Sequence, residues 1–172
     1  MTDTELKLKD AGIQLKLALD AFAARDEEQL RSCINAFISH ARSITFVMQV
    51  ESHPFPLLAK WYVERMNAMR TNPLMRFYNE KRVHSVHKGV VKANRRTVRI
   101  EKITVAGKTV ATGGTAALYE FDGVEEFLTP DRGKEVFNLS EQYFLLLKHL
   151  VMEWLEVRAS LSLPQSLSDF RP

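Results

Sequence analysis

Apolar residues recur at intervals of three and four along the first 50 residues of the chain, and this spacing is typical of helices that bury one face. In residues 4–24 the repeat comprises Leu8, Ala11, Leu15, Ala18 and Phe22. A second repeat comprises Leu30, Ile34, Phe37, Ala41, Ile44 and Met48. Asp26, with Gln29 three residues later, has the pattern of a capping box that begins the second helix. The pattern predicts two long antiparallel helices joined by a tight turn.

Prolines divide the next part of the chain into two further helices. The sequence SHPFP at 52–56 ends the second helix, because proline has no amide hydrogen and disfavours helical angles in the residue before it. A third helix is expected to begin at about Pro56. Asn72 followed by Pro73 is typical of a helix start, so a fourth helix is expected from Pro73 to about Val86, with Gly89 at its end.

The pattern then changes to β-branched and aromatic residues, which predicts a small antiparallel hairpin or three-stranded meander at about 96–121. A last long helix is expected to be capped by Ser140, with Tyr143, Leu147, Leu150, Trp154 and Val157 on its apolar face. The fold class is therefore mainly α: a bundle of four to five helices with a β insertion before the last one, in a single domain over residues 1–172.

Composition agrees with one folded domain. The chain has 172 residues, of which 45% are hydrophobic, so it can bury one sizeable core. Its beginning is charged, and no apolar run is long enough to span a membrane, so we expect a cytoplasmic protein. Cys33, the single cysteine, is expected to be a small buried hydrophobe. The helical faces carry more apolar surface than one small bundle needs, which favours a homodimer.

Positive charge is concentrated in residues 81–99. This segment holds seven Lys or Arg residues and no acid, although the formal net charge of the whole chain is only +3. Such a run is either an ordinary solvated surface or a surface that follows a phosphate backbone. The candidate nucleic-acid-binding residues are Lys81, Lys88, Lys92, Arg95, Arg96 and Arg99.

Several common chemistries lack their motifs. The sequence AGKT at 106–109 has Lys102 where a phosphate-binding loop needs its first glycine, and no dinucleotide-binding, zinc-protease or serine-hydrolase motif occurs. His84 and His87 are spaced so that they could lie on one side of a helix, but no third metal ligand is evident nearby. We therefore expect no cofactor and no metal.

Arg82 and His87 fit a pattern of arginine, four to six intervening residues and histidine, and they lie in the sequence RVHSVHKG at the end of the predicted fourth helix. In this motif and in its long helices the chain resembles the HEPN superfamily, whose members are helical, typically dimeric and in many cases metal-independent ribonucleases of toxin or defence systems. The resemblance covers roughly residues 4–90 and 139–160. It does not account for the β insertion.

The resemblance implies a ribonuclease site in which His87 removes the proton of the ribose 2′-hydroxyl and Arg82 stabilises the charged phosphate. His84 and Asn79 are weaker candidates for the same site. Val83 stands where members commonly carry a polar residue, which weighs against catalysis more than against fold. Residues five apart are about 140° apart around a regular helix. The helix must therefore end before His87, or two protomers must share the site.

A second hypothesis needs no catalysis. The chain would be a dimeric helical interaction module that binds nucleic acid or a partner protein, such as a cognate antitoxin, with the basic segment as a contact surface. In the simplest case Arg82 and His87 are only cations at a helix end, where the helix dipole favours them.

Overall fold

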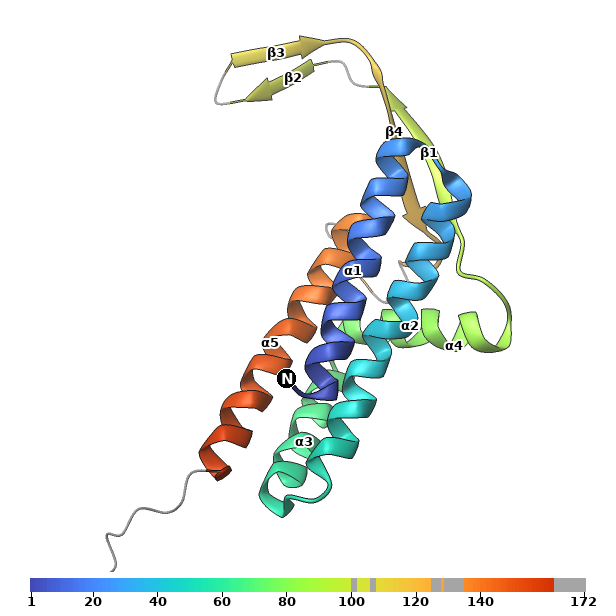
Figure 1. Cartoon of the computed structure of the whole chain (residues 1–172). Helices are drawn as coiled ribbons and strands as arrows, with labels where there is room; N and C mark the ends of the chain where they lie inside the picture. Colours follow the sequence, from blue (N-terminus) through green and yellow to red (C-terminus); the bar gives the residue numbers. More distant parts are fainter. Residues whose placement is uncertain (100–101, 106–107, 125–127, 129–134, 163–172) are drawn as a thin grey trace, which may run out of the picture.

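The computed structural model describes residues 1–99, 102–105, 108–124, 128 and 135–162. In this part of the chain five helices surround one core, and four strands stand between the fourth and fifth helices (Figure 1). The mainly α class with a β insertion before the last helix is confirmed. The elements are α1 (Asp3–Ala24), α2 (Glu27–Ser52), α3 (Pro56–Arg70), α4 (Pro73–His87), β1 (Ala93–Arg99), β2 (Lys102–Val105), β3 (Lys108–Thr112), β4 (Thr115–Phe121) and α5 (Val136–Ser162).

The helices α1 and α2 form the predicted antiparallel pair, and local signals fix their ends. Thr2 and Glu5 make a reciprocal capping box at the start of α1. The Asp26 carboxylate accepts a hydrogen bond from the Gln29 amide at the start of α2, as expected. Arg25 between the helices adopts a left-handed conformation with φ of 59°, which ends α1 and lets the chain reverse.

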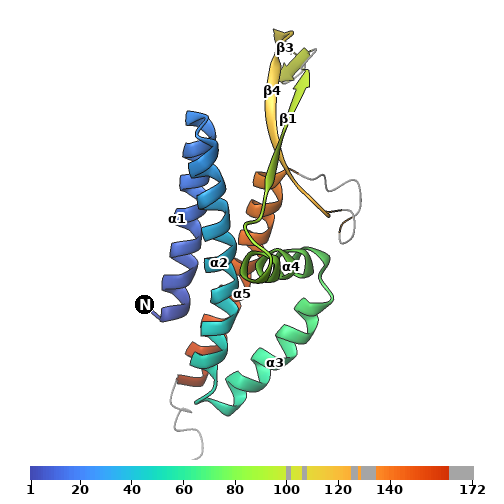
Figure 2. The ribbon, with the colours of Figure 1, turned by 90° about the vertical axis from the view of Figure 1, so that its right-hand side faces the viewer.

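The helices α3 and α4 begin where the prolines predict. Asn72 accepts hydrogen bonds from the amides of Leu74 and Met75, and Pro73 occupies the first turn of α4. Gly89 follows the end of α4 with a φ of 122°, a conformation that favours glycine. Figure 2 shows α4 lying across the bundle rather than along it, whereas α1, α2 and α5 run side by side.

The predicted cap of the last helix is wrong. Helix α5 begins at Val136, and the Glu135 carboxylate accepts hydrogen bonds from the amides of Phe137 and Asn138. Ser140 lies inside the helix, where it is fully buried and its hydroxyl is 2.8 Å from that of Tyr78 on α4. A serine at the start of an apolar run resembles a cap in sequence, but here it partners a buried phenol.

An aromatic cluster joins the helices to the base of the β insertion. The rings of Tyr78 and Tyr143 are stacked at 4.0 Å, and Phe37 meets both rings edge-on. Phe121, the last residue of β4, packs against Phe77 with ring centroids 5.5 Å apart. These side chains are among the most buried in the molecule, so the last residue of β4 is part of the core.

The β insertion is a long arm and not a meander. Strand β1 pairs with β4, and β2 pairs with β3, both antiparallel, so the chain goes out along one edge and returns along the other. Figures 1 and 2 show β1 and β4 extending beyond the ends of α1 and α2, with β2 and β3 farther out. The first strand begins at Ala93, three residues earlier than expected. We call the paired β1 and β4 the ribbon.

Two smaller features complete the description. Cys33 is buried as expected, with 7% of its surface exposed. Within the described residues, no helix combines the length and the apolar character that a membrane crossing requires.

Candidate nucleic-acid interface

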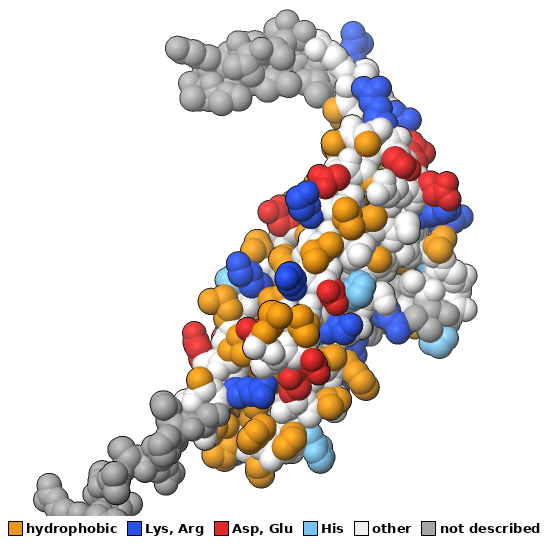
Figure 3. All heavy atoms as spheres, in the orientation of Figure 1, with side chains coloured by type: hydrophobic (Ala, Val, Ile, Leu, Met, Phe, Trp, Pro, Cys, Tyr) orange, Lys and Arg blue, Asp and Glu red, His pale blue; other side chains and the backbone are white. Residues whose placement is uncertain are grey.

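The ribbon carries three arginines on β1. Successive residues of a strand point to opposite faces, so Arg95 and Arg99 lie on one face and Arg96 on the other. All three are exposed, and β1 contains no acidic residue. Figure 3 shows Lys and Arg side chains gathered along the ribbon, above Asp and Glu side chains at the nearby ends of the helices. The ribbon therefore offers positive charge on both of its faces.

Two of these arginines make ion pairs with acids. Arg95 Nη1 is 3.5 Å from Glu27 Oε1 at the start of α2, and Arg96 Nη1 is 3.2 Å from Glu120 Oε1 on β4. The arginine side chains remain 56% and 65% exposed. An exposed pair of this kind contributes less than about 1 kcal/mol. A phosphate group can therefore replace either carboxylate as the partner at little cost.

The base of the ribbon is held to the helices by specific contacts. The Tyr119 hydroxyl of β4 donates a hydrogen bond of 3.1 Å to Glu27, and its ring meets that of Phe22 edge-on. The Asn35 side chain of α2 bonds both the amide and the carbonyl of Val91, at 2.9 and 3.0 Å. The ribbon is thus fixed at one end, and its arginines have a defined position relative to the bundle.

The segment between α4 and β1 continues the basic surface. Lys88 and Lys92 are exposed. Lys81 is half-buried, lies over the ring of Phe77 and donates a hydrogen bond to the carbonyl of Asp122, so it is partly a structural residue. A groove beside β1 is lined by Lys92 and Arg95 together with Arg31 of α2, and also by the acids Glu27 and Glu28. Sequence analysis missed Arg31, because only the fold brings it beside residues some sixty positions away.

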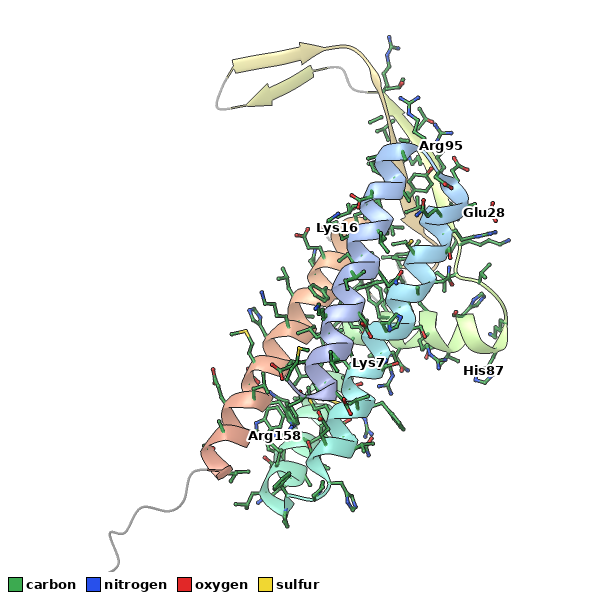
Figure 4. All side chains as sticks on the ribbon, in the orientation of Figure 1. Lys7, Lys16, Glu28, His87, Arg95 and Arg158 are labelled. Atoms are coloured by element: carbon green, nitrogen blue, oxygen red, sulfur yellow. The ribbon has the colours of Figure 1, made fainter. Side chains whose placement is uncertain are left out.

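The predicted catalytic residues are not assembled into one site within the chain. Helix α4 continues through His87, so the expected break before this residue is absent and Arg82 and His87 belong to one regular helix. The side chains of Arg82, His84 and His87 make no hydrogen bond or ion pair with any described residue. Figure 4 shows His87 at the end of α4 and Arg95 beside the ribbon, on the same edge of the molecule.

Asn79 makes a contact that the sequence analysis did not predict. Its Oδ1 accepts a hydrogen bond of 3.2 Å from Nε of Arg42 on α2, at the mouth of a cleft between the helices. Its role as a weaker candidate beside Arg82 stays a prediction. In the part of the chain that the structure describes, no three His, Cys, Asp or Glu side chains gather as metal ligands would.

A comparison with protein families decides which family the chain resembles. The model of the family described as "Bacteriophage lambda protein ea47" matches residues 4–107, more than half of the chain. The chain belongs to the ea47 family. The matched region extends from α1 to β2 and includes every residue of the basic segment. No curated protein and no solved structure matches the chain.

Membership of the ea47 family corrects the resemblance to the HEPN superfamily. The match is to the ea47 family and no HEPN family matches, so that assignment is wrong. Its residue basis was a short Arg and His motif on α4 together with long helices. Neither is specific, because many helical bundles place cations at the end of a helix.

Proposed function

We propose that this member of the ea47 family is a non-catalytic nucleic-acid-binding protein that contacts the phosphate backbone with its ribbon and the basic segment before it. The observation that carries the proposal is the position of the arginines on β1. They stand on a two-stranded projection beyond the helices, exposed on both faces and anchored at the base.

Duplex DNA fits this surface better than duplex RNA. A two-stranded β-ribbon can enter the major groove of B-DNA, which is about 12 Å wide, whereas the major groove of A-form RNA is too narrow for it. Arginine pairs with phosphate through two parallel donors. Asn94 on β1 is exposed as well, and its amide donates a hydrogen bond to the Asp122 carboxylate, which a base edge would have to replace. The ribbon is the part of the molecule shaped for such a contact.

The ribonuclease activity remains a prediction, and it no longer has the support of a family assignment. It rested on the HEPN resemblance, and Arg82, His84 and His87 do not converge within one chain. The homodimer, a cognate partner protein and a cytoplasmic location also remain predictions from sequence. Incubating the protein with RNA in the presence of a chelator tests the nuclease directly, and cleavage that is lost in both Arg82→Ala and His87→Ala would favour it over simple binding.

A titration of labelled duplex DNA, followed by fluorescence anisotropy, tests the proposal. Wild type is compared with a ribbon variant in which Arg95, Arg96 and Arg99 are changed to Gln. A control variant changes Lys9, Lys16 and Lys60 to Gln, which are exposed residues on α1 and α3. Because the net charge of the two variants is equal, any difference between them reports the location of the charge.

The ribbon variant is expected to bind duplex DNA at least tenfold more weakly than the control variant. Equal loss in both variants would mean that only overall charge matters, and would overturn the proposal. Absence of binding by wild type at low salt would overturn it as well. A parallel titration with duplex RNA should give the weaker affinity, and tighter RNA binding would contradict the choice of DNA.

A further inference from the structure

A cleft of about 380 Å³ opens between α2, α3, α4 and α5, away from the ribbon. Its floor includes three buried groups: the hydroxyl-bearing side chains of Thr45, Tyr62 and Tyr143. Three arginines from three helices line it as well: Arg42, Arg70 and Arg76. Binding sites for small molecules commonly have volumes of about 300 to 1,000 Å³. The cleft is thus large enough for a small ligand.

The Tyr143 hydroxyl is a hydrogen-bond donor at this floor. Tyr143 is only 2% exposed, yet its hydroxyl makes no hydrogen bond to any residue that the structure describes. The hydroxyls of the two neighbouring tyrosines do have partners. Tyr62 donates a hydrogen bond of 2.8 Å to the Thr45 carbonyl, and Tyr78 shares one with Ser140. The hydroxyl of Tyr143 is not among the described side-chain atoms that are buried without a partner, so it is accessible from the cleft that Tyr143 lines. A ligand oxygen in the cleft can therefore accept its hydrogen bond.

The charge of the cleft identifies the kind of partner. No Asp or Glu is among the described residues that line it. Arg42 donates to Asn79 and to the Thr45 hydroxyl, and Arg70 donates to Asn67 at 3.3 Å. These partners are neutral and orient the guanidinium groups without neutralising them. Burial raises the pKa of Tyr143, so its phenol stays protonated and is available as a donor.

We propose that this cleft binds a small phosphate monoester, with the phosphate among the arginines and an apolar body against the methionines. Guanidinium groups present paired donors that match phosphate oxygens, and a phosphate monoester carries a charge of about −1.5 to −2 at neutral pH. Met66, Met69 and Met75 line the cleft and supply an adaptable apolar wall. The Tyr143 hydroxyl then donates to a ligand oxygen.

Isothermal titration calorimetry of the full chain with phenyl phosphate tests this inference. Inorganic phosphate carries the charge without the apolar body, and phenol carries the body without the charge. The two test variants are Tyr143→Phe, which removes one hydroxyl and keeps the ring stacked on Tyr78, and Arg42→Gln. Lys9→Gln is the control, since Lys9 is an exposed cation of α1 that does not line the cleft.

Phenyl phosphate is expected to bind more tightly than inorganic phosphate, and phenol is expected not to bind. The affinity should fall at least tenfold in Tyr143→Phe and in Arg42→Gln, and should be unchanged in Lys9→Gln. Tyr143→Phe should unfold at the same temperature as wild type or higher, because the ligand-free protein loses only an unpaired hydroxyl. Failure of phenyl phosphate to bind at millimolar concentration, or equal affinity in all three variants, would overturn the proposal.

The ribbon variant separates this site from the nucleic-acid interface. Changing Arg95, Arg96 and Arg99 to Gln alters residues that do not line the cleft, so it should leave the affinity for phenyl phosphate unchanged. If the ribbon variant loses affinity for both phenyl phosphate and DNA, the cleft is not a separate site and the inference is wrong.

Discussion

At the scale of single residues, Ser52 connects the end of α2 to the core of α5. Its hydroxyl donates a hydrogen bond of 2.6 Å to the Met48 carbonyl and accepts one of 2.9 Å from Nε1 of Trp154. Ser52 and Trp154 are both buried. The indole N–H has no other acceptor in the apolar core. Its hydrogen bond to Ser52 therefore contributes more to stability than an ordinary surface hydrogen bond does.

We therefore expect Ser52→Ala to lower the free energy of unfolding by about 1 to 3 kcal/mol, measured by urea denaturation. Ser43→Ala is the matched control, because Ser43 makes the same kind of bond to the carbonyl four residues earlier but on an exposed part of α2. The control should change stability by less than about 0.5 kcal/mol. Equal effects in the two variants would show that the bond to Trp154 contributes nothing.

The tyrosines give a second prediction at this scale. All four tyrosines, Tyr62, Tyr78, Tyr119 and Tyr143, have a pKa raised above the ordinary value of 10, mainly because burial disfavours the phenolate. A raised folded-state pKa means that the stability contribution is complete below about pH 10 and is lost as pH rises further. The midpoint of the tyrosinate absorbance change should therefore lie above pH 10, together with unfolding. A tyrosine that ionises below pH 10 in the folded protein would contradict the structure.

Residue-level signals in the sequence were dependable where they act locally. Asp26 and Asn72 cap their helices as predicted, because an N-cap side chain bonds amides only two or three residues away. Ser140 failed as a cap because its real partner, Tyr78, is 62 positions away in the sequence. The bond between Asn79 and Arg42 was missed for the same reason, since Arg42 is on another helix.

At the scale of elements, the arm divides into an anchored part and an outer part. The ribbon is tied to the helices through Tyr119, Phe121 and the chain near Val91, whereas β2 and β3 pair only with each other among the described strands. The sequence predicted strands in this region from its β-branched residues but not their order. The order depends on which strands pair, and pairing joins residues that are distant along the chain.

Removing the outer part should leave the bundle intact. Arg99 and Thr115 are paired across the ribbon, so an Asn-Gly turn can join them in place of residues 100–114. The shortened protein is expected to keep its helical circular dichroism and to unfold within about 5 °C of wild type, because no part of the core is removed. Loss of helical signal would show that β2 and β3 support the bundle.

At the scale of the whole molecule, the helical architecture followed from the sequence, but the family did not. Helical periodicity and proline positions specify how many helices there are and where they begin, and these features recur in many unrelated bundles. The Arg82 and His87 motif is short, and the HEPN resemblance depended on its predicted place at the end of a helix. In the structure both residues belong to one regular helix, and the match to the ea47 family replaces the HEPN assignment.

The basic segment, residues 81–99, remains a prediction about the site. Its charge is visible in the sequence, because the segment contains seven Lys or Arg residues and no acid, whatever structure it adopts. Its shape was not visible, since only the pairing of β1 with β4 turns part of the segment into a projecting ribbon. The cleft with Tyr143 left no signal in the sequence, because its arginines are spread over three helices.

The prediction of a homodimer also belongs to this scale. Light scattering of the purified chain should give twice the mass of 19.7 kDa if the apolar residues exposed on the helices pair between copies. A mass of one chain at micromolar concentration would contradict it. The DNA-binding proposal holds in either state, because the ribbon is complete within one chain.

The most direct test of the central claim is the salt dependence of DNA binding. For B-DNA, the logarithm of the association constant falls against the logarithm of salt concentration by about 0.9 for each phosphate neutralised. Changing Arg95, Arg96 and Arg99 to Gln should therefore make the slope shallower by about 2 to 3, whereas changing Lys9, Lys16 and Lys60 should leave it as in wild type. If the slope is the same for all three proteins, the ribbon does not contact the phosphate backbone and the account is wrong.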